Sequence, residues 1–174
     1  MTFSTQITTM TSQISILFID ANVLDYQLLL AGLAPDVYAH LLTNNRDGVE
    51  QITEILDREY SHRDIRTVHI VSHGAPGCLY LGNTELSLDT LERYAKSLKT
   101  WPDAALFFYG CNVAVGDAGE EFISKLHLVT GAENAASKTL TGNAALGGNW
   151  DLEFSTQTFS QKASLEANDV AVML

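Results

Sequence analysis

The stretch ALFFYGCNVAVGDAGE, residues 105–120, decides how the fold of this chain is interpreted. Its first five residues, 105–109, are apolar or aromatic and carry no charge, which is typical of a buried strand in a parallel sheet. Cys111 follows after one glycine, and two further glycines lead into apolar residues at helical spacing. We therefore expect Cys111 at the carboxyl end of a strand, where ligands bind in open α/β sheets.

An earlier stretch has the same design. The apolar run TVHIVS, residues 67–72, leads directly into His73 and Gly74. One predicted strand thus ends in a histidine and the other in Cys111. Because neighbouring parallel strands lie about 4.8 Å apart, the two side chains could reach one bound peptide.

The remaining pattern predicts an α/β domain in which strands and helices alternate along a mostly parallel sheet with right-handed crossovers. Gly82 and Asn83 predict a tight hairpin turn, since both residue types tolerate positive φ. We expect a flexible leader over residues 1–13, a single domain over 14–160 and a frayed C-terminal tail over 161–174. The predicted elements are strands at 14–19, 37–42, 66–72, 78–81, 84–86, 105–109, 132–136 and 150–154, helices at 26–33, 49–60, 88–98 and 120–130, and a mobile loop at 137–149.

Charge and cysteine content narrow the classes of partner. The formal net charge of −11, with only ten basic residues, disfavours nucleic acid and anionic membranes. Cys78 and Cys111 do not form a disulfide framework. The start of the sequence has neither a signal peptide nor a run long enough to span a membrane, so the default expectation is a cytoplasmic, reducing compartment. No cofactor is expected.

Other chemistries fit the sequence less well. His69 and His73 are four residues apart, which on a strand separates their Cα atoms by about 13 Å, so no metal site is expected. The turn after Cys111 has neither a dinucleotide-binding pattern nor a Walker lysine, and no Gly-x-Ser-x-Gly elbow is present. Taken alone, a cysteine such as Cys111 is more often an inert core thiol, and we assign His40, His69 and His127 to hydrogen-bonded core positions.

A thiol, an imidazole and backbone N–H donors together make an acyl-transfer site. Cys111 and His73 are the candidate thiol and imidazole of such a site. The N–H groups of Gly74 and Cys111 would point into the same space.

Several motifs then carry a family resemblance. An apolar strand ending in His-Gly, followed by another ending in a small residue and Cys, resembles the caspase, gingipain and legumain group of cysteine peptidases. More closely, the chain resembles the bacterial DUF4347 family, which is found in cyanobacteria and proteobacteria, from residue 16 to 154. The motifs that carry this resemblance are HIVSHGAPG at 69–77, LGN at 81–83, YGCNV at 109–113, AAS at 135–137, LTG at 140–142 and GGNWDLE at 147–153.

This resemblance implies a three-layer caspase-like sandwich and a cysteine endopeptidase with a Cys-His dyad. It implies Cys111 as the nucleophile, His73 as the base, and the N–H groups of Gly74 and Cys111 as the oxyanion hole. By analogy, the loop after the first strand would line the pocket for the P1 residue, and its acidic Asp20, beside Asn22, would favour a basic P1 side chain. Tyr109 and Asn112 are expected to contact the peptide or protein substrate as well. The alternative is a pseudopeptidase that recognises proteins in a bacterial surface or assembly system without catalysis.

Overall fold

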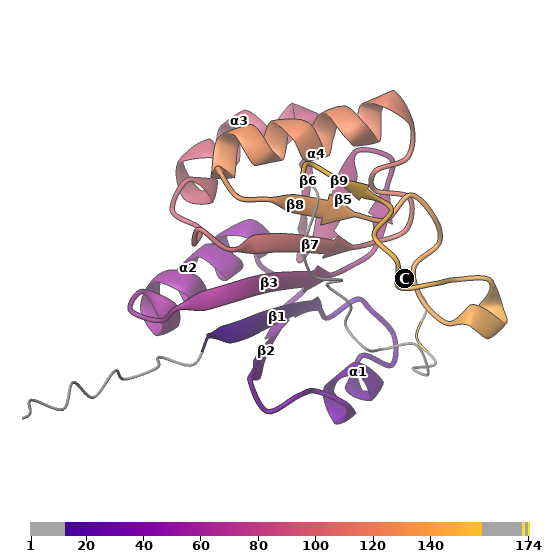
Figure 1. Ribbon diagram of the computed structural model, residues 1–174, viewed down its shortest axis with the longest axis horizontal. Helices are drawn as coiled ribbons and strands as arrows, with labels where there is room; N and C mark the ends of the chain where they lie inside the picture. Colours follow the sequence, from indigo (N-terminus) through magenta and orange to yellow (C-terminus); the bar gives the residue numbers. More distant parts are fainter. Residues whose placement is uncertain (1–12, 158–171, 173) are drawn as a thin grey trace, which may run out of the picture.

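The computed structural model describes residues 13–157, 172 and 174, and shows an α/β fold (Figure 1). Its elements, in chain order, are β1 (Ile14–Asp20), α1 (Gln27–Ala31), β2 (Val37–Leu42), α2 (Gly48–Tyr60), β3 (Ile65–Val71), β4 (Gly74–Ala75), β5 (Cys78–Leu81), β6 (Thr84–Ser87), α3 (Leu88–Leu98), β7 (Ala105–Tyr109), α4 (Gly116–Thr130), β8 (Asn134–Ala136), the 3-10 turn η1 (Ala144–Leu146) and β9 (Phe154–Ser155). The expected alternation of strands and helices is confirmed.

The central sheet has six strands in the order β2-β1-β3-β7-β8-β9. Every neighbouring pair is parallel except β8 and β9, which pair antiparallel. The largely buried strands β1, β3 and β7 form the middle of this sheet, where both faces are covered, and this explains why they are rich in apolar residues. The mostly parallel sheet predicted from the sequence is confirmed.

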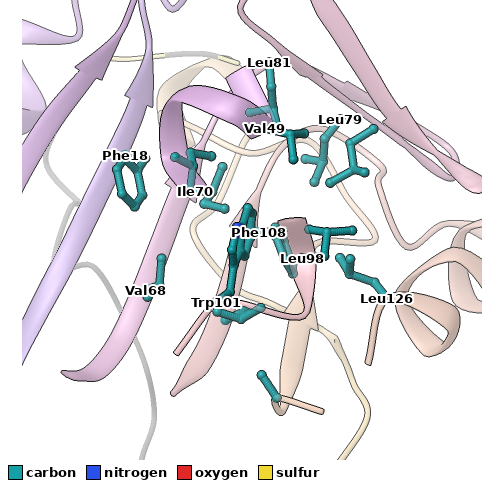
Figure 2. Close-up of a cluster of buried hydrophobic side chains, with 14 of the residues drawn as sticks. Phe18, Val49, Val68, Ile70, Leu79, Leu81, Leu98, Trp101, Phe108 and Leu126 are labelled. Atoms are coloured by element: carbon teal, nitrogen blue, oxygen red, sulfur yellow. The ribbon is translucent and has the colours of Figure 1, made fainter. Parts of the chain in front are cut away.

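The two faces of the sheet are covered unequally. One face packs against α2, α3 and α4 in a large core that includes Phe18, Ile70 and Phe108 (Figure 2). The other face carries a smaller cluster, which we call the second-face cluster. Its buried members are Leu17, Ile19, Val23, Leu29, Val71, Phe107, Tyr109, Ala135, Trp150 and Val172, and Leu174 packs against it.

A small three-stranded sheet, β4-β5-β6, branches off directly after β3. The predicted hairpin turn is confirmed: β5 and β6 pair antiparallel, and Gly82 between them has φ +63°. A Cβ atom at Gly82 would lie 2.1 Å from the Arg46 carbonyl oxygen, so only glycine fits there.

Two expectations need correction or fall mostly outside the described residues. The predicted strand at 150–154 is wrong for most of its length, because Trp150 is buried in the second-face cluster and pairing begins only at Phe154. The predicted leader and tail lie outside the described residues except for Gln13, Val172 and Leu174. The loop 137–149 does lie beside Cys111, held by hydrogen bonds from Asn112 N to Thr139 O and from Ala114 N to Ser137 O.

Candidate functional site

The register between β3 and β7 brings the two candidate catalytic residues to the same level. These strands are direct neighbours, and Val71 is paired with Tyr109. His73 and Cys111 each follow two residues later, so both leave the carboxyl edge of the sheet side by side. The ladder continues one step further, because Ser72 N donates to Tyr109 O at 3.0 Å. Sequence reasoning placed the two residues at adjacent or next-adjacent strand ends, and they are adjacent.

His73 is half-buried and held from the loop after β1. Its Nε2 lies 3.2 Å from the carbonyl oxygen of Asn22. A carbonyl oxygen only accepts hydrogen bonds, so in this contact Nε2 carries the proton. Nδ1 is then the ring nitrogen that keeps a lone pair and is available to take a proton. Asn22 thus contributes its backbone to the site, while its side chain is exposed.

Cys111 lies at the floor of the site with 8% of its surface exposed. Its Sγ accepts a hydrogen bond from Thr141 N at 3.4 Å, and the thiol donates to the carbonyl oxygen of Leu174 at 2.8 Å. An N–H group that points at sulfur is the kind of donor that a thiolate accepts. Within residues 13–157, 172 and 174 no hydrogen bond joins Cys111 to His73 directly.

Gly74 lies against the backbone of the Cys111 turn. A Cβ atom at this position would lie 2.5 Å from Val113 Cγ2 and 3.2 Å from the carbonyl oxygen of Cys111. The close approach requires glycine, since any side chain would push the two segments apart. It brings the backbone that follows His73 next to the backbone of Cys111, the two segments whose N–H groups were expected to act together.

Asp20 has a different environment from the one expected. The residue is only 1% exposed. One carboxylate oxygen accepts from Asn22 N at 2.8 Å and the other accepts from Gly82 N. The carboxylate therefore ties the end of β1 to the β5–β6 turn. With both oxygens used by backbone donors inside the protein, it does not line an open pocket for a basic side chain.

The other two expected substrate contacts also differ in exposure. Tyr109 is fully buried and packs in the second-face cluster, with its ring 5.8 Å from that of Trp150 and 5.9 Å from that of His69. Tyr109 therefore belongs to the core next to the site and does not face a substrate. Asn112 is half-buried and has φ +59°, a conformation that asparagine tolerates better than most residues. It turns the chain directly after Cys111.

Two features of the site were not assigned from the sequence. Thr141 contributes its backbone N–H to the Cys111 sulfur, and its own side chain is fully buried with no hydrogen-bond partner for Oγ1. It belongs to the LTG motif at 140–142, which marked the segment without indicating a role. Leu174 gave no signal in the sequence, because its contact with Cys111 joins residues 63 positions apart.

The remaining histidines and the second cysteine lie outside this arrangement. His40, His69 and His127 each have a hydrogen-bond partner, as expected: Tyr60, Thr67 and the Ala132 carbonyl, respectively. Burial lowers the pKa of His69 to about 4. Burial, with a smaller contribution from Glu85, raises the pKa of Cys78 to about 11.

The described part of the chain offers neither a metal-binding cluster nor a membrane-spanning helix. Over residues 13–157, 172 and 174, no three histidine, cysteine or carboxylate side chains group together in a way that could hold a metal ion. In the same residues, every helix is too short or too polar to cross a membrane.

The fold is thus an α/β sandwich with a mostly parallel central sheet, consistent with a caspase-like fold, and with a histidine and a cysteine at adjacent strand ends. The sequence pattern of a family described as a domain of unknown function, DUF4347, matches residues 16–172. The chain belongs to this family.

Individual proteins resemble this chain less clearly than the family pattern does. No curated protein sequence matches the chain. Among solved structures, the crystal structure of caspase-1 from Spodoptera frugiperda is similar, with 19% sequence identity and a TM-score of 0.34. The match covers 57% of this chain and 48% of that chain, so it spans about half of the caspase.

Proposed function

We propose that this domain is a cysteine peptidase that hydrolyses peptide bonds through Cys111 and His73. The observation that carries the proposal is the strand register, in which Val71 pairs with Tyr109. His73 and Cys111 each follow two residues later and so lie at the same edge of the sheet. Two adjacent strand ends supply a nucleophile and a base, as covalent catalysis at a carbonyl requires.

The proposed reaction uses groups whose surroundings are described above. His73 Nδ1 takes the thiol proton, and the Cys111 sulfur attacks the peptide carbonyl carbon. The oxyanion that forms accepts hydrogen bonds from the N–H groups of Gly74 and Cys111. The imidazolium then gives its proton to the leaving amine as the C–N bond breaks. A water molecule hydrolyses the resulting thioester, which releases the acyl product and restores the thiol.

The hydrogen bond from His73 Nε2 to the Asn22 carbonyl supports this assignment of roles. It fixes the ring and gains strength when the imidazole becomes charged, because a charged donor makes a stronger hydrogen bond. A basic P1 preference through Asp20 is not part of the proposal, since both oxygens of that carboxylate are buried and accept backbone hydrogen bonds.

The test is turnover of a mixed peptide pool by the wild type and by Cys111→Ala, followed by mass spectrometry. Cys78→Ala is the matched control, because it removes the other free thiol. We expect Cys111→Ala and His73→Ala to lose turnover while their thermal midpoints stay near the wild type, and Cys78→Ala to keep it. Equal turnover by Cys111→Ala would refute the proposal.

A second candidate function is a non-catalytic recognition module that uses the same site. The low exposure of Cys111 and the contact between its sulfur and Leu174 favour it. This function predicts a Cys111 that iodoacetamide labels no faster than an ordinary thiol near pH 7. Rapid, selective labelling of Cys111 would count against it, since fast alkylation requires an accessible thiolate.

A further inference from the structure

The oxygen that accepts a hydrogen bond from the Cys111 thiol is the main-chain oxygen of Leu174, a residue of the same chain. Leu174 O is 2.8 Å from Sγ. Two backbone hydrogen bonds connect the same part of the chain to the loop beside Cys111: Leu174 N donates to Thr141 O at 3.1 Å, and Asn143 N donates to Val172 O at 2.7 Å. In Figure 1 the end of the chain lies beyond the arrowheads of β3 and β7.

The pattern of these bonds is that of an added antiparallel strand. Donation from position 143 to 172 and from position 174 to 141 is the kind of exchange that antiparallel segments make. Many proteins bind extended peptides in this way, with the main chain providing the affinity and alternate side chains providing the specificity. Here the added strand runs toward the sulfur and delivers a carbonyl group to it.

The side chains of this strand lie on apolar surface. Val172 is 1% exposed and belongs to the second-face cluster, and Leu174 packs against that cluster. Tyr109 and Trp150 are members of the same cluster and lie at this edge of the sheet. The surroundings of Leu174 are therefore apolar, and the only acidic group expected near a P1 side chain, Asp20, is already used by backbone donors.

We propose that Val172 and Leu174 occupy the acyl side of the Cys111 site as a substrate-like segment in cis, with Leu174 in the P1 position. The preferred substrates are then peptides with an aliphatic P1 residue, and they must displace this segment to reach Cys111. The assignment of Leu174 to P1 rests on the proposed function, because P1 names a position in a peptidase substrate. The binding of Val172 and Leu174 over Cys111 does not require that the protein cleave peptides.

The first test measures access to Cys111 in the full chain. In a Cys78→Ser background Cys111 is the sole thiol, and its rate of labelling by iodoacetamide reports opening of the segment. Leu174→Asp removes apolar packing and adds a charge to an apolar site, so we expect labelling to be about tenfold faster than in the parent, as for a segment released from local structure. Leu174→Ala should give a smaller increase.

The matched control is Leu146→Asp, the same change at a leucine that is 66% exposed in the loop beside the site. It should leave the labelling rate unchanged. Circular dichroism and thermal melts check that each variant is folded, and Leu174→Ala carries the test if Leu174→Asp does not fold. Equal labelling of the parent and the folded Leu174 variants would overturn the occupancy.

The second test addresses the P1 residue. Two peptide aldehydes with the sequences acetyl-Val-Met-leucinal and acetyl-Val-Met-argininal are added to Leu174→Asp, and labelling of Cys111 is measured again. Addition of the thiol across the aldehyde gives a hemithioacetal and consumes no other reagent. We expect at least tenfold stronger protection by the leucine compound, from its apolar side chain. Equal protection, stronger protection by the arginine compound or protection by neither would overturn the P1 assignment.

These outcomes are separable from those of the proposed function. A protein that shows selective protection but never cleaves peptides keeps the inference and loses the peptidase. A protein that cleaves after arginine, with Cys111 equally accessible in all variants, keeps the peptidase and loses the inference.

Discussion

At the scale of single residues, Asp20 shows how a charged side chain can be structural at the edge where catalysis is expected. Its carboxylate accepts hydrogen bonds from Asn22 N, two residues along the chain, and from Gly82 N, which is 62 residues away. An ionised carboxylate accepts at both oxygens, whereas an amide accepts at only one. The position therefore distinguishes aspartate from asparagine by hydrogen bonding.

We predict that Asp20→Asn lowers the free energy of unfolding by about 1–3 kcal/mol, because one of the two partly buried backbone hydrogen bonds to this side chain loses its acceptor. Urea denaturation measures this. Asp25→Asn is the control: Asp25 is exposed and has φ +57°, which asparagine tolerates, so its midpoint should not move. If Asp20→Asn instead left stability unchanged but altered selectivity among basic and neutral peptides, Asp20 would be a substrate-binding residue after all.

His69 is a second buried polar residue, and its ring packs against those of Phe107 and Tyr109 at centroid distances of 5.1 and 5.9 Å. Burial lowers its pKa from 6.5 to about 4. Between these values the unfolded chain binds more protons than the folded protein, so stability rises with pH across this window and is lost as pH falls through it. The contribution of His69 to this loss is roughly 3 kcal/mol when the pH has fallen to 4.

We predict that His69→Leu, which cannot titrate, removes this part of the pH dependence. The measurement is the free energy of unfolding from urea curves at pH 7, 6, 5 and 4 for both proteins. The difference in the free energy of unfolding between wild type and variant should narrow or reverse as pH falls. The carboxylates titrate in both proteins, so their contributions cancel in this difference. A difference that stays constant from pH 7 to 4 would show that His69 does not titrate in this range.

At the scale of elements, the site depends on how closely the His73–Gly74 segment approaches the turn between β7 and α4. A Cβ on Gly74 would lie 2.5 Å from Val113 Cγ2, which is side chain, and 3.2 Å from the Cys111 carbonyl oxygen, which is backbone. We predict that Gly74→Ala costs about 1–3 kcal/mol of stability and at least tenfold in turnover. The backbone contact explains why the cost cannot be relieved entirely by side-chain movement.

Val113→Ala separates the two contacts in a double-mutant cycle. The variant alone is destabilised, because Val113 is fully buried. In the double variant the side-chain clash is gone, so its stability loss should be about 1 kcal/mol smaller than the sum of the single losses. Turnover should remain low, since the backbone contact persists. Strict additivity of the unfolding free energies would mean that Val113 does not press on position 74.

The elements also show what sequence reasoning can and cannot find. Strands β1, β3 and β7 were predictable because a strand covered on both faces is rich in apolar residues. The alternation at 150–154 was misleading, because Trp150 is apolar to fill the second-face cluster rather than to pair in a ladder. The positions of Cys111 and His73 at neighbouring strand ends were also predictable, because each follows an apolar run. The roles of Asp20, Thr141 and Leu174 depend on contacts between distant segments, and no local pattern encodes these.

At the scale of the whole molecule, the two faces of the sheet are covered by different means. Helices α2, α3 and α4 cover one face, whereas the five-residue α1 and residues from the far end of the sequence cover the other. Val172 therefore contributes to the second core and, through Asn143, to the strand that lies on Cys111. Stability and access to the site are linked by this segment.

We predict that Val172→Ala lowers the free energy of unfolding by about 1–3 kcal/mol, because it removes buried apolar groups, and that it also speeds the labelling of Cys111. Urea denaturation and iodoacetamide kinetics in the Cys78→Ser background measure the two effects. The control is Leu128→Ala, at a leucine that is 73% exposed on α4, which should change neither. A variant that lost stability without faster labelling would show that the second core holds its residues independently of the strand over Cys111, and the two functions of this segment would then be separate.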